Sequence, residues 1–182
     1  MTDNIFLVGM MGAGKTTLGR ALARRLGRDF VDCDRVLVER TGVPVATIFE
    51  IEGEDGFRRR ETSVLRELAA RDRCVIATGG GVVLSEANRD LMRSSGTVVY
   101  LKARLENLWE RTRHDSTRPL LATPNPRARL AELLAEREPL YQEAAHVVVE
   151  TGQQSPATAV GRVLAALREL SDTWSRDEPS SR

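Results

Sequence analysis

Eight residues near the amino terminus, Gly9–Thr16, constrain the fold of this 182-residue chain most strongly. They match the pattern G-x-x-x-x-G-K-[ST] and lie between an apolar, strand-like run, Ile5–Val8, and a helical pattern over Lys15–Leu26. Glycines let such a loop wrap a polyphosphate with backbone N–H groups pointing inward, and the following helix adds positive partial charge at its amino terminus. The motif therefore predicts a nucleotide-binding strand, loop and helix.

The positions of this motif have separate predicted roles. Lys15, one of only two lysines in the chain, is expected to reach the β- and γ-phosphates. The Thr16 hydroxyl is expected to ligate the Mg²⁺ ion that accompanies ATP. The predicted phosphate cradle comprises Gly12, Ala13, Gly14, Lys15, Thr16 and Thr17. The loop alone does not distinguish GTPases, transport ATPases and small-molecule kinases, because all of them carry it.

Short apolar runs alternate with helical patterns along the whole chain. This alternation predicts an α/β fold in which a parallel sheet is covered by helices on both faces. The expected strands are Ile5–Val8, Phe30–Val31, Cys74–Ala77, Val98–Leu101 and Val147–Val149. The expected helices cover residues 15–26, 34–40, 53–71, 85–94, 105–113, 126–143 and 156–170.

The domain organisation is expected to be simple. No stretch within residues 1–170 has the composition of a linker, so this range is predicted to be a single domain, of a size that suits one core. Residues 115–126 are rich in proline and are predicted to form a mobile lid. The polar segment 171–182 is predicted to be a largely disordered tail.

Composition argues against several functions. The formal net charge is +1, so no global field favours nucleic acid or a membrane surface as a partner. The run Ile5–Val8 is too short for a signal-peptide core, and no stretch approaches the roughly 20 apolar residues of a membrane span. Cys33 and Cys74 lack metal-binding spacing and are expected to be buried thiols. We therefore expect a cytoplasmic protein. A monomer is expected as well.

The acidic partner of the phosphate loop is expected at Asp32-Cys33-Asp34. No run of four or more apolar residues ends in aspartate, as a Walker B strand would, whereas these acids follow the short second strand. If the backbone stays extended there, both carboxylates lean to one side, at the carboxyl ends of the strands where such sheets bind ligands. The alternative is that one of them, Asp34 in particular, only caps the helix that follows.

Six motifs in register resemble the bacterial shikimate kinases. They are Gly9–Thr16, Asp32-x-Asp34, Phe57-Arg58-Arg59-Arg60-Glu61, Gly79-Gly80-Gly81, Arg118-Pro119-Leu120-Leu121 and Arg137-x-x-x-Tyr141, and they cover essentially residues 1–170. The resemblance implies a five-stranded parallel sheet like that of nucleoside monophosphate kinases, with a lid and a helical substrate-binding segment. It also implies transfer of the γ-phosphate of ATP to the 3-hydroxyl of shikimate, a step towards chorismate and the aromatic amino acids.

The resemblance further implies roles for individual side chains. Asp32 would help to hold Mg²⁺, and Asp34 would bind substrate hydroxyls and accept the proton of the attacking hydroxyl. Arg58, oriented by Glu61, and Arg137 would bind the substrate carboxylate. A guanidinium fork suits a planar carboxylate better than an ammonium group does. By pattern alone, both arginines are unremarkable members of charged helices.

Other implied roles belong to loops. The backbone of Gly79–Gly81 would contact the substrate, and close approach to a ligand would explain the entropy that three consecutive glycines lose on folding. Arg118, from the lid, would stabilise charge on the transferring phosphoryl group, although an ordinary exposed lid arginine remains an alternative. Arg111 would stack on the adenine, and Gln154 and Pro156 would lie in the adenine loop.

The sequence leaves two other classes open. One is a related kinase that acts on another small hydroxy acid such as gluconate, or on a nucleoside monophosphate. Arg58, Arg137 and the glycine triplet suit a small hydroxylated carboxylic acid, whereas a nucleotide would need a base pocket, which the sequence does not identify. The other is a non-catalytic ligand-sensing module that keeps the fold, which would be expected to lose Lys15 or Asp34. A nucleic-acid-dependent ATPase is disfavoured by the length and the near-neutral charge. His114 and His146 match no catalytic motif and are expected to be structural or solvent-facing, as are Arg59 and Arg60.

Overall fold

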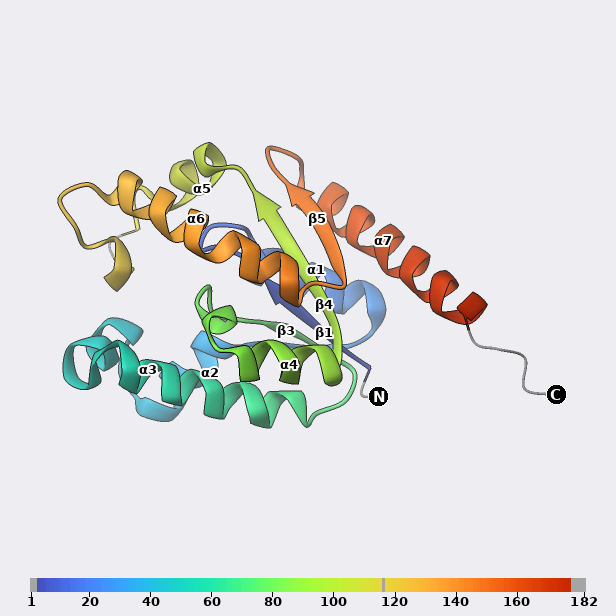
Figure 1. The fold of residues 1–182 in the computed structure, drawn as a ribbon, viewed down its shortest axis with the longest axis horizontal. Coiled ribbons are helices and arrows are strands. Elements are labelled where there is room, and N and C mark those ends of the chain that lie inside the picture. Colours follow the sequence, from blue (N-terminus) through green and yellow to red (C-terminus); the bar gives the residue numbers. More distant parts are fainter. Residues whose placement is uncertain (1–2, 116, 178–182) are drawn as a thin grey trace.

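A computed structural model describes residues 3–115 and 117–177. Its centre is a five-stranded, all-parallel sheet with the strand order β2-β3-β1-β4-β5 (Figure 1). The strands are β1 (Asn4–Val8), β2 (Asp29–Asp32), β3 (Cys74–Ala77), β4 (Gly96–Ala103) and β5 (Val147–Thr151). Every residue of β1 and β3 is buried, because helices cover both faces of the sheet. The five predicted strands are thus confirmed.

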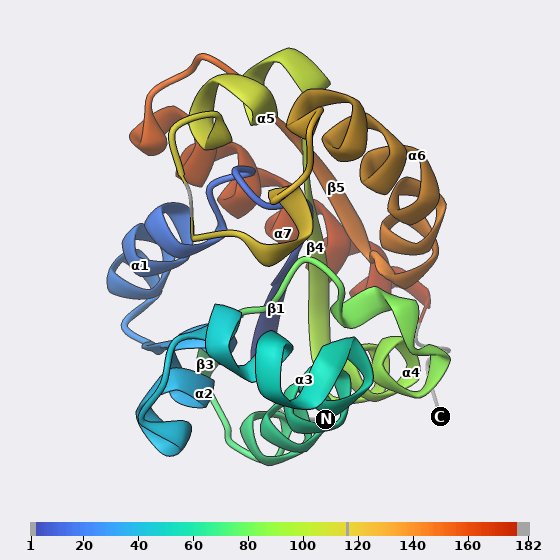
Figure 2. The same ribbon diagram turned by 90° about the vertical axis from the view of Figure 1, so that its left-hand side faces the viewer.

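The helices form a layer on each side of this sheet. They are α1 (Lys15–Leu26), α2 (Cys33–Thr41), α3 (Val45–Ala69), α4 (Glu86–Ser94), α5 (Leu105–Thr112), α6 (Pro126–Ala144) and α7 (Pro156–Asp177), with the short 3-10 helices η1 (Val82–Leu84) and η2 (Pro119–Leu121). Helices α1 and α7 contact each other on one face, and α4 and α6 pack against β4 on the other (Figures 1 and 2). The predicted three-layer α/β/α class is therefore confirmed.

The strand order places the candidate site residues at one end of the sheet. The chain leaves the central strand β1 through α1 to the edge strand β2, and later returns from β3 to β4 on the other side of β1. Sheets of this kind bind ligands outside the carboxyl ends of the strands, where the connections diverge. Here those ends carry the loop Gly9–Thr16 after β1, Asp32 at the end of β2 and Gly79–Gly81 after β3.

Helix α3 differs from the sequence-based prediction. We expected a helix from Gly53, but it begins at Val45, directly after Pro44. Gly53 is a kink within it, with φ 69° and ψ −179°, a conformation that glycine adopts with least strain. Gly56 lets the two parts pack closely, since a Cβ there would lie 2.4 Å from Cβ of Glu52. The glycines interrupted the helical pattern in the sequence without ending the helix.

The last helix is longer than predicted. We expected α7 to end at Leu170, but it continues to Asp177, so the first part of the segment 171–182 is helical and the prediction of disorder was wrong there. The helix continues because no glycine or proline follows before Pro179. Residues 178–182 lie outside the described part of the chain. Within the described part, no helix has the length and apolar character needed to cross a membrane.

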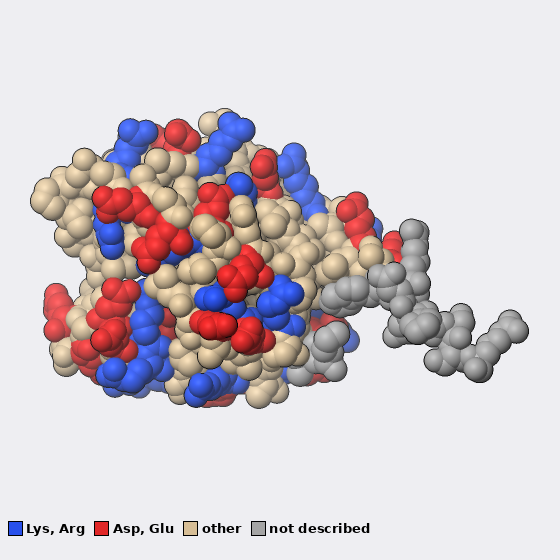
Figure 3. Space-filling view, in the orientation of Figure 1, with Lys and Arg blue, Asp and Glu red and all other residues tan. Residues whose placement is uncertain are grey.

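The surface agrees with the near-neutral charge of the sequence. On the face shown in Figure 3, basic and acidic side chains are interspersed and do not gather into a patch of one sign. Both cysteines, Cys33 and Cys74, are buried free thiols, as predicted. His114 is exposed, and Nδ1 of His146 accepts a hydrogen bond of 3.0 Å from the backbone N–H of Val98, which agrees with the structural or solvent-facing roles expected of them.

Candidate active site

The phosphate loop owes its shape to glycine. Gly12 and Gly14 have φ angles of 81° and 95°, in the left-handed region that side chains disfavour. Gly14 immediately precedes α1, whose amino terminus has no side-chain cap. The N–H of Ala13 donates to the carbonyl of Met10 at 3.1 Å and closes the turn. The free N–H groups of α1 are therefore available to an anion in the loop.

A cavity of about 360 Å³ opens between this loop and the carboxyl ends of the neighbouring strands. Nζ of Lys15 lies at its wall and donates to the carbonyls of Gly9, at 2.7 Å, and Met10, at 3.0 Å. Burial lowers the pKa of Lys15 to about 8, an effect that Asp34 opposes and Arg118 reinforces. The ammonium group is thus held by neutral carbonyls of the loop, and a phosphate would supply a partner of opposite charge.

Asp32 connects this loop to β2 and α2. One of its carboxylate oxygens accepts a hydrogen bond of 2.6 Å from the Thr16 hydroxyl. The other accepts from the backbone N–H groups of Asp34, at 3.1 Å, and Arg35, at 3.3 Å, and so caps α2. The cap that the sequence allowed at Asp34 is therefore Asp32. The backbone is not extended through both acids, because Asp34 lies in the first turn of α2, which agrees with the helix expected from residue 34. Both acids nevertheless line the same cavity.

The pair Thr16 and Asp32 is suited to Mg²⁺. A hydroxyl and a carboxylate oxygen lie side by side at the edge of the phosphate cavity. Mg²⁺ prefers oxygen ligands, and in nucleotide sites it takes one or two protein oxygens together with phosphates and water. The donor set therefore fits this ion.

A second cavity, of about 720 Å³, adjoins the phosphate cavity. The molecule is visibly hollowed at the left edge of Figure 3, between α3 and the segment after α5. The charged residues that line this second cavity include Arg58 and Glu61 from α3 and Arg137 from α6. Arg58 bonds Glu61 at 2.8 Å through Nη1 and Glu54 at 3.0 Å through Nη2. The predicted contact between Arg58 and Glu61 is therefore present.

Arg137 is unusually well buried for an arginine. Its exposed fraction is 2%, and its Nε has no hydrogen-bond partner within the described chain. Nε of Arg58 is likewise buried and unpaired. Buried guanidinium groups with unused donors favour an anionic ligand, since an unsatisfied charged donor costs free energy. The two arginines thus converge on one cavity, as predicted.

The glycine triplet after β3 has a packing reason that sequence reasoning missed. A Cβ at Gly79 would lie 2.3 Å from Oε1 of Glu61, and a Cβ at Gly81 would lie 2.2 Å from Nη2 of Arg58. At Gly80 the closest approach would be an ordinary 3.5 Å. Gly79 and Gly81 are therefore required for the charged side chains of α3 to reach the cavity, whatever the backbone itself contacts.

Asp34 stands where the two cavities meet, because it lines both. Its Oδ1 is buried and has no hydrogen-bond partner in the described chain. Burial and the nearby Asp32 raise the pKa of Asp34, while Lys15 and Arg118 act in the opposite direction. An unpaired carboxylate oxygen with a raised pKa is suited to accepting a proton from a ligand.

The predicted lid carries Arg118 over the same junction. Arg118 lines both cavities and pairs with Asp115 at 2.9 Å through Nε. The next residues, Pro119 and Leu120, belong to η2 and line the larger cavity. In Figure 2 this segment crosses between the part that carries α5 and α6 and the part that carries α3. Ser116 lies outside the described residues, and the mobility of residues 115–126 stays a prediction.

A third cavity, of about 300 Å³, continues from the other side of the phosphate loop. Ala13 and Thr17 line it, together with Arg111, Gln154 and Pro156. Arg111 bridges its walls by donating to the carbonyls of Gly12, at 3.0 Å, and Gly152. Nε2 of Gln154 donates to the carbonyl of Glu150 at 2.9 Å. The predicted adenine residues are thus brought together, and their contacts with a base stay predictions.

Comparisons with known proteins decide the family. A family model described as shikimate kinase matches residues 11–168. The chain belongs to the shikimate kinase family. A shikimate kinase from Nitrosospira multiformis is 61% identical over 155 residues, which are 85% of this chain and 80% of that protein. One from Ralstonia nicotianae is 57% identical over 165 residues, covering 91% and 87% respectively.

A solved structure extends this likeness to the fold. The shikimate kinase from Acinetobacter baumannii, determined in complex with shikimate, matches this member of the family with a TM-score of 0.90 and 46% identity. The match covers 93% of this chain and 94% of that one. The resemblance drawn from the six motifs is therefore confirmed at the level of family and fold.

Sequence reasoning missed the apolar wall of the larger cavity. This wall is formed by the segment between α2 and α3 and the start of α3, together with Phe57. Phe49 and Phe57 lie with ring centroids 4.6 Å apart. The run Val43–Ala46 and Phe49 could have been noticed as apolar residues next to the interrupted helical pattern. Such a wall suits the faces of a small ring.

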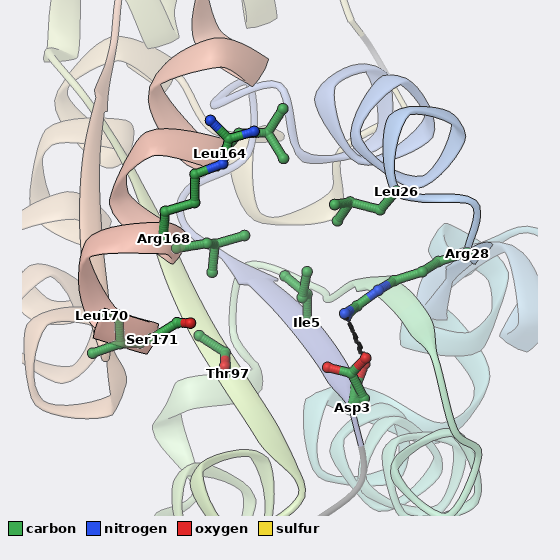
Figure 4. A pocket seen from close by; sticks show the side chains of 10 residues that line it. Asp3, Ile5, Leu26, Arg28, Thr97, Leu164, Arg168, Leu170 and Ser171 are labelled. Atoms are coloured by element: carbon green, nitrogen blue, oxygen red, sulfur yellow. Dashed lines mark hydrogen bonds and ion pairs between the residues drawn. The ribbon is translucent and has the colours of Figure 1, made fainter. Parts of the chain in front are cut away.

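Another cavity lies between α1 and α7, at the end of the sheet opposite to the candidate active site (Figure 4). Arg28 and Asp3 pair across its edge at 2.6 Å. Its apolar lining is Ile5, Leu26, Leu164, Leu167 and Leu170. Because Ile5 lies near the start of β1, this cavity is separate from the site at the carboxyl ends of the strands.

Proposed function

We propose that this protein is a shikimate kinase, which transfers the γ-phosphate of ATP to the 3-hydroxyl of shikimate and releases shikimate 3-phosphate and ADP. The observation that carries the proposal is the position of Asp34. Its unpaired carboxylate oxygen lies between a cavity with the features of a phosphate site and a cavity lined by the part-buried Arg58 and the buried Arg137. A proton acceptor between a phosphate donor and an anionic acceptor is what phosphoryl transfer to a hydroxy acid requires.

The acceptor cavity matches the chemistry of shikimate. Arg58 and Arg137 provide guanidinium donors for the carboxylate, and Phe49 and Phe57 provide an apolar surface for the ring. We propose that Asp34 and the backbone of Gly79–Gly81, which line the same cavity, bind the hydroxyls. A nucleotide acceptor would instead need donors and acceptors for a base, and a neutral sugar would offer no negative charge to the unused Nε donors of Arg58 and Arg137.

We propose the following course for phosphoryl transfer. The substrate hydroxyl oxygen attacks the γ-phosphorus, the bond from that phosphorus to the β,γ-bridging oxygen breaks, and the hydroxyl proton passes to Asp34. Lys15 neutralises charge on the β- and γ-phosphates, and the N–H groups at the start of α1 hold the remaining phosphate oxygens. Thr16 and Asp32 would hold Mg²⁺, which supplies further neutralisation of the phosphates when it is bound.

Arg118 lines both cavities from the predicted lid segment. Its position over both cavities allows its guanidinium to follow the phosphoryl group during transfer, once its pairing with Asp115 is exchanged for a phosphate oxygen. Closure of residues 115–126 over both substrates would also exclude water, and so suppress hydrolysis of ATP. We propose further that the enzyme acts as a cytoplasmic monomer.

The test is an ADP-release assay coupled to an indicator reaction, with shikimate, quinate, gluconate and AMP as alternative acceptors. We expect shikimate to give the highest kcat/KM and AMP to give only the background rate of ATP hydrolysis. A higher kcat/KM with gluconate or AMP would contradict the proposal. The absence of ADP release with every acceptor, from protein that still binds ATP, would favour a ligand-sensing module.

A further inference from the structure

Tyr141 is a buried side chain that the mechanism above does not use. It lies on α6, one helical turn after Arg137, and its ring stacks on Tyr100 of β4 with centroids 5.0 Å apart. Its hydroxyl donates to the backbone carbonyl of Gly80 and lies 3.5 Å from the sulfur of Met10. A residue in the wall between α6 and the sheet is therefore bonded to the middle of the glycine triplet.

The carbonyls of this triplet are held in two different ways. Those of Gly79 and Gly81 accept from the backbone N–H groups of Val82, at 3.3 Å, and Leu84, at 3.1 Å, and so belong to the turn that forms η1. The carbonyl of Gly80 points instead to the side chain of Tyr141. The orientation of the central peptide unit thus depends on a hydroxyl from another element.

Gly80 is also where three parts of the site come together. A Cβ placed on it would lie 3.5 Å from the backbone nitrogen of Met11 in the phosphate loop and 3.6 Å from Nη1 of Arg137. Because the peptide between Gly80 and Gly81 is planar and trans, fixing the Gly80 carbonyl also fixes the direction of the Gly81 N–H, which points away from Tyr141. Both glycines line the acceptor cavity.

We propose that Tyr141 is a positioning residue for the acceptor, whose hydroxyl holds the Gly80–Gly81 peptide in register with Arg137 on the same helix. The inference rests on the proposed function, because it takes the glycine backbone and Arg137 to be the surface that binds shikimate. Burial raises the pKa of Tyr141, so the phenol stays protonated and remains a donor throughout the neutral range. The ring stack on Tyr100 fixes the direction of this donor.

The variant Tyr141→Phe removes the hydroxyl and keeps the ring. We expect KM for shikimate to rise about 5- to 20-fold, the range expected when one hydrogen bond to a part-buried carbonyl is lost, while KM for ATP changes less than about twofold. The matched control is Tyr100→Phe, which removes a hydroxyl from the other ring of the same stack and should leave KM for shikimate within about twofold of the wild type. Partial misfolding would lower the apparent kcat by reducing the fraction of active enzyme and would leave KM for shikimate and KM for ATP unchanged.

Hydrogen exchange provides a second measurement that does not depend on turnover. Amide exchange in the peptide that contains Gly79–Gly81 should accelerate in Tyr141→Phe and not in Tyr100→Phe, because only the former releases the Gly80 carbonyl. Unchanged KM for shikimate and unchanged exchange in Tyr141→Phe would overturn the inference. Equal increases in KM for shikimate and KM for ATP in this variant would overturn it as well. If the wild type fails to phosphorylate shikimate, the proposed function is wrong; if the wild type is active and Tyr141→Phe matches it, only the positioning role is wrong.

Discussion

Replacement of Gly81 by alanine is expected to disable the acceptor site without unfolding the protein. The added Cβ would lie 2.2 to 2.3 Å from three guanidinium atoms of Arg58, so the two groups cannot keep their present positions. The overlap is with the far end of a flexible side chain and not with backbone, so the guanidinium can move away. Movement would break its contact with Glu61 and remove it from the carboxylate of the acceptor.

The size of the effect follows from the contact that is lost. A hydrogen-bonded charge pair in a partly desolvated pocket contributes about 2–4 kcal/mol, which corresponds to about 30- to 1000-fold in kcat/KM. Arg58→Ala should lose this full amount for shikimate. Gly81→Ala should lose at least about tenfold, because the displaced guanidinium retains part of its long-range attraction for the carboxylate.

A double-mutant cycle distinguishes this explanation from a general defect in the loop. In the Arg58→Ala background the space around residue 81 is free, so Gly81→Ala should then cost less than about twofold. Steady-state kinetics with shikimate varied at saturating ATP, together with the thermal midpoint of each variant, provide the data. If Gly81→Ala is as damaging without Arg58 as with it, the close approach to Arg58 is not the reason for glycine at this position.

Three other predictions concern the catalytic groups. Lys15→Ala should fold and lose orders of magnitude in kcat, measured by ADP release. Because burial lowers the pKa of Lys15 to about 8, the free enzyme loses this charge above that pH, so its affinity for ATP should weaken as the pH rises through 8. Calorimetry at several pH values measures this affinity, and a flat profile would contradict the prediction. Asp34→Asn should lower kcat by at least about 10²-fold with little change in ATP affinity, and a collapse of ATP binding would place Asp34 in the metal site instead. Proteolysis within residues 117–125 should slow only when an ATP analogue and shikimate are both bound, and equal cleavage in all states would refute the proposal that this segment is a lid. Arg118→Ala should lower kcat by a larger factor than it lowers the affinity for either ligand.

The sequence predicted those parts of the fold that depend on local pattern. The five strands were found because each is a short apolar run, and α1 was predicted with its correct bounds because the phosphate loop determines where it begins. The start of α3 was missed, since Gly53 looks like a helix boundary and Gly56 weakens the helical pattern next to it. Their roles, a kink and a close contact with Glu52, depend on tertiary packing that no local pattern reports.

The candidate site shows the same division. The motifs identified the charged and glycine residues that line the cavities, but they did not identify the apolar wall or the contacts that each residue makes. Asp32 caps α2 and also bonds Thr16, so its two oxygens have separate partners, which spacing alone could not reveal. Gly79 and Gly81 make room for Glu61 and Arg58, residues that are distant from them in sequence. Such requirements become visible only when the two segments are placed side by side.

Arg58 and Arg137 are proposed to hold the carboxylate of shikimate beside Asp34. This role is tested most directly by comparing kcat/KM for shikimate with that for its neutral carboxamide, in the wild type and in Arg58→Ala and Arg137→Ala. We predict that the wild type prefers the acid by about 30- to 1000-fold and that each variant loses most of this preference, because the charge that distinguishes the two acceptors no longer has its partner. A general defect would instead lower both values equally. If both variants retain the full preference for the acid, these arginines do not bind the carboxylate and the account of the site is wrong.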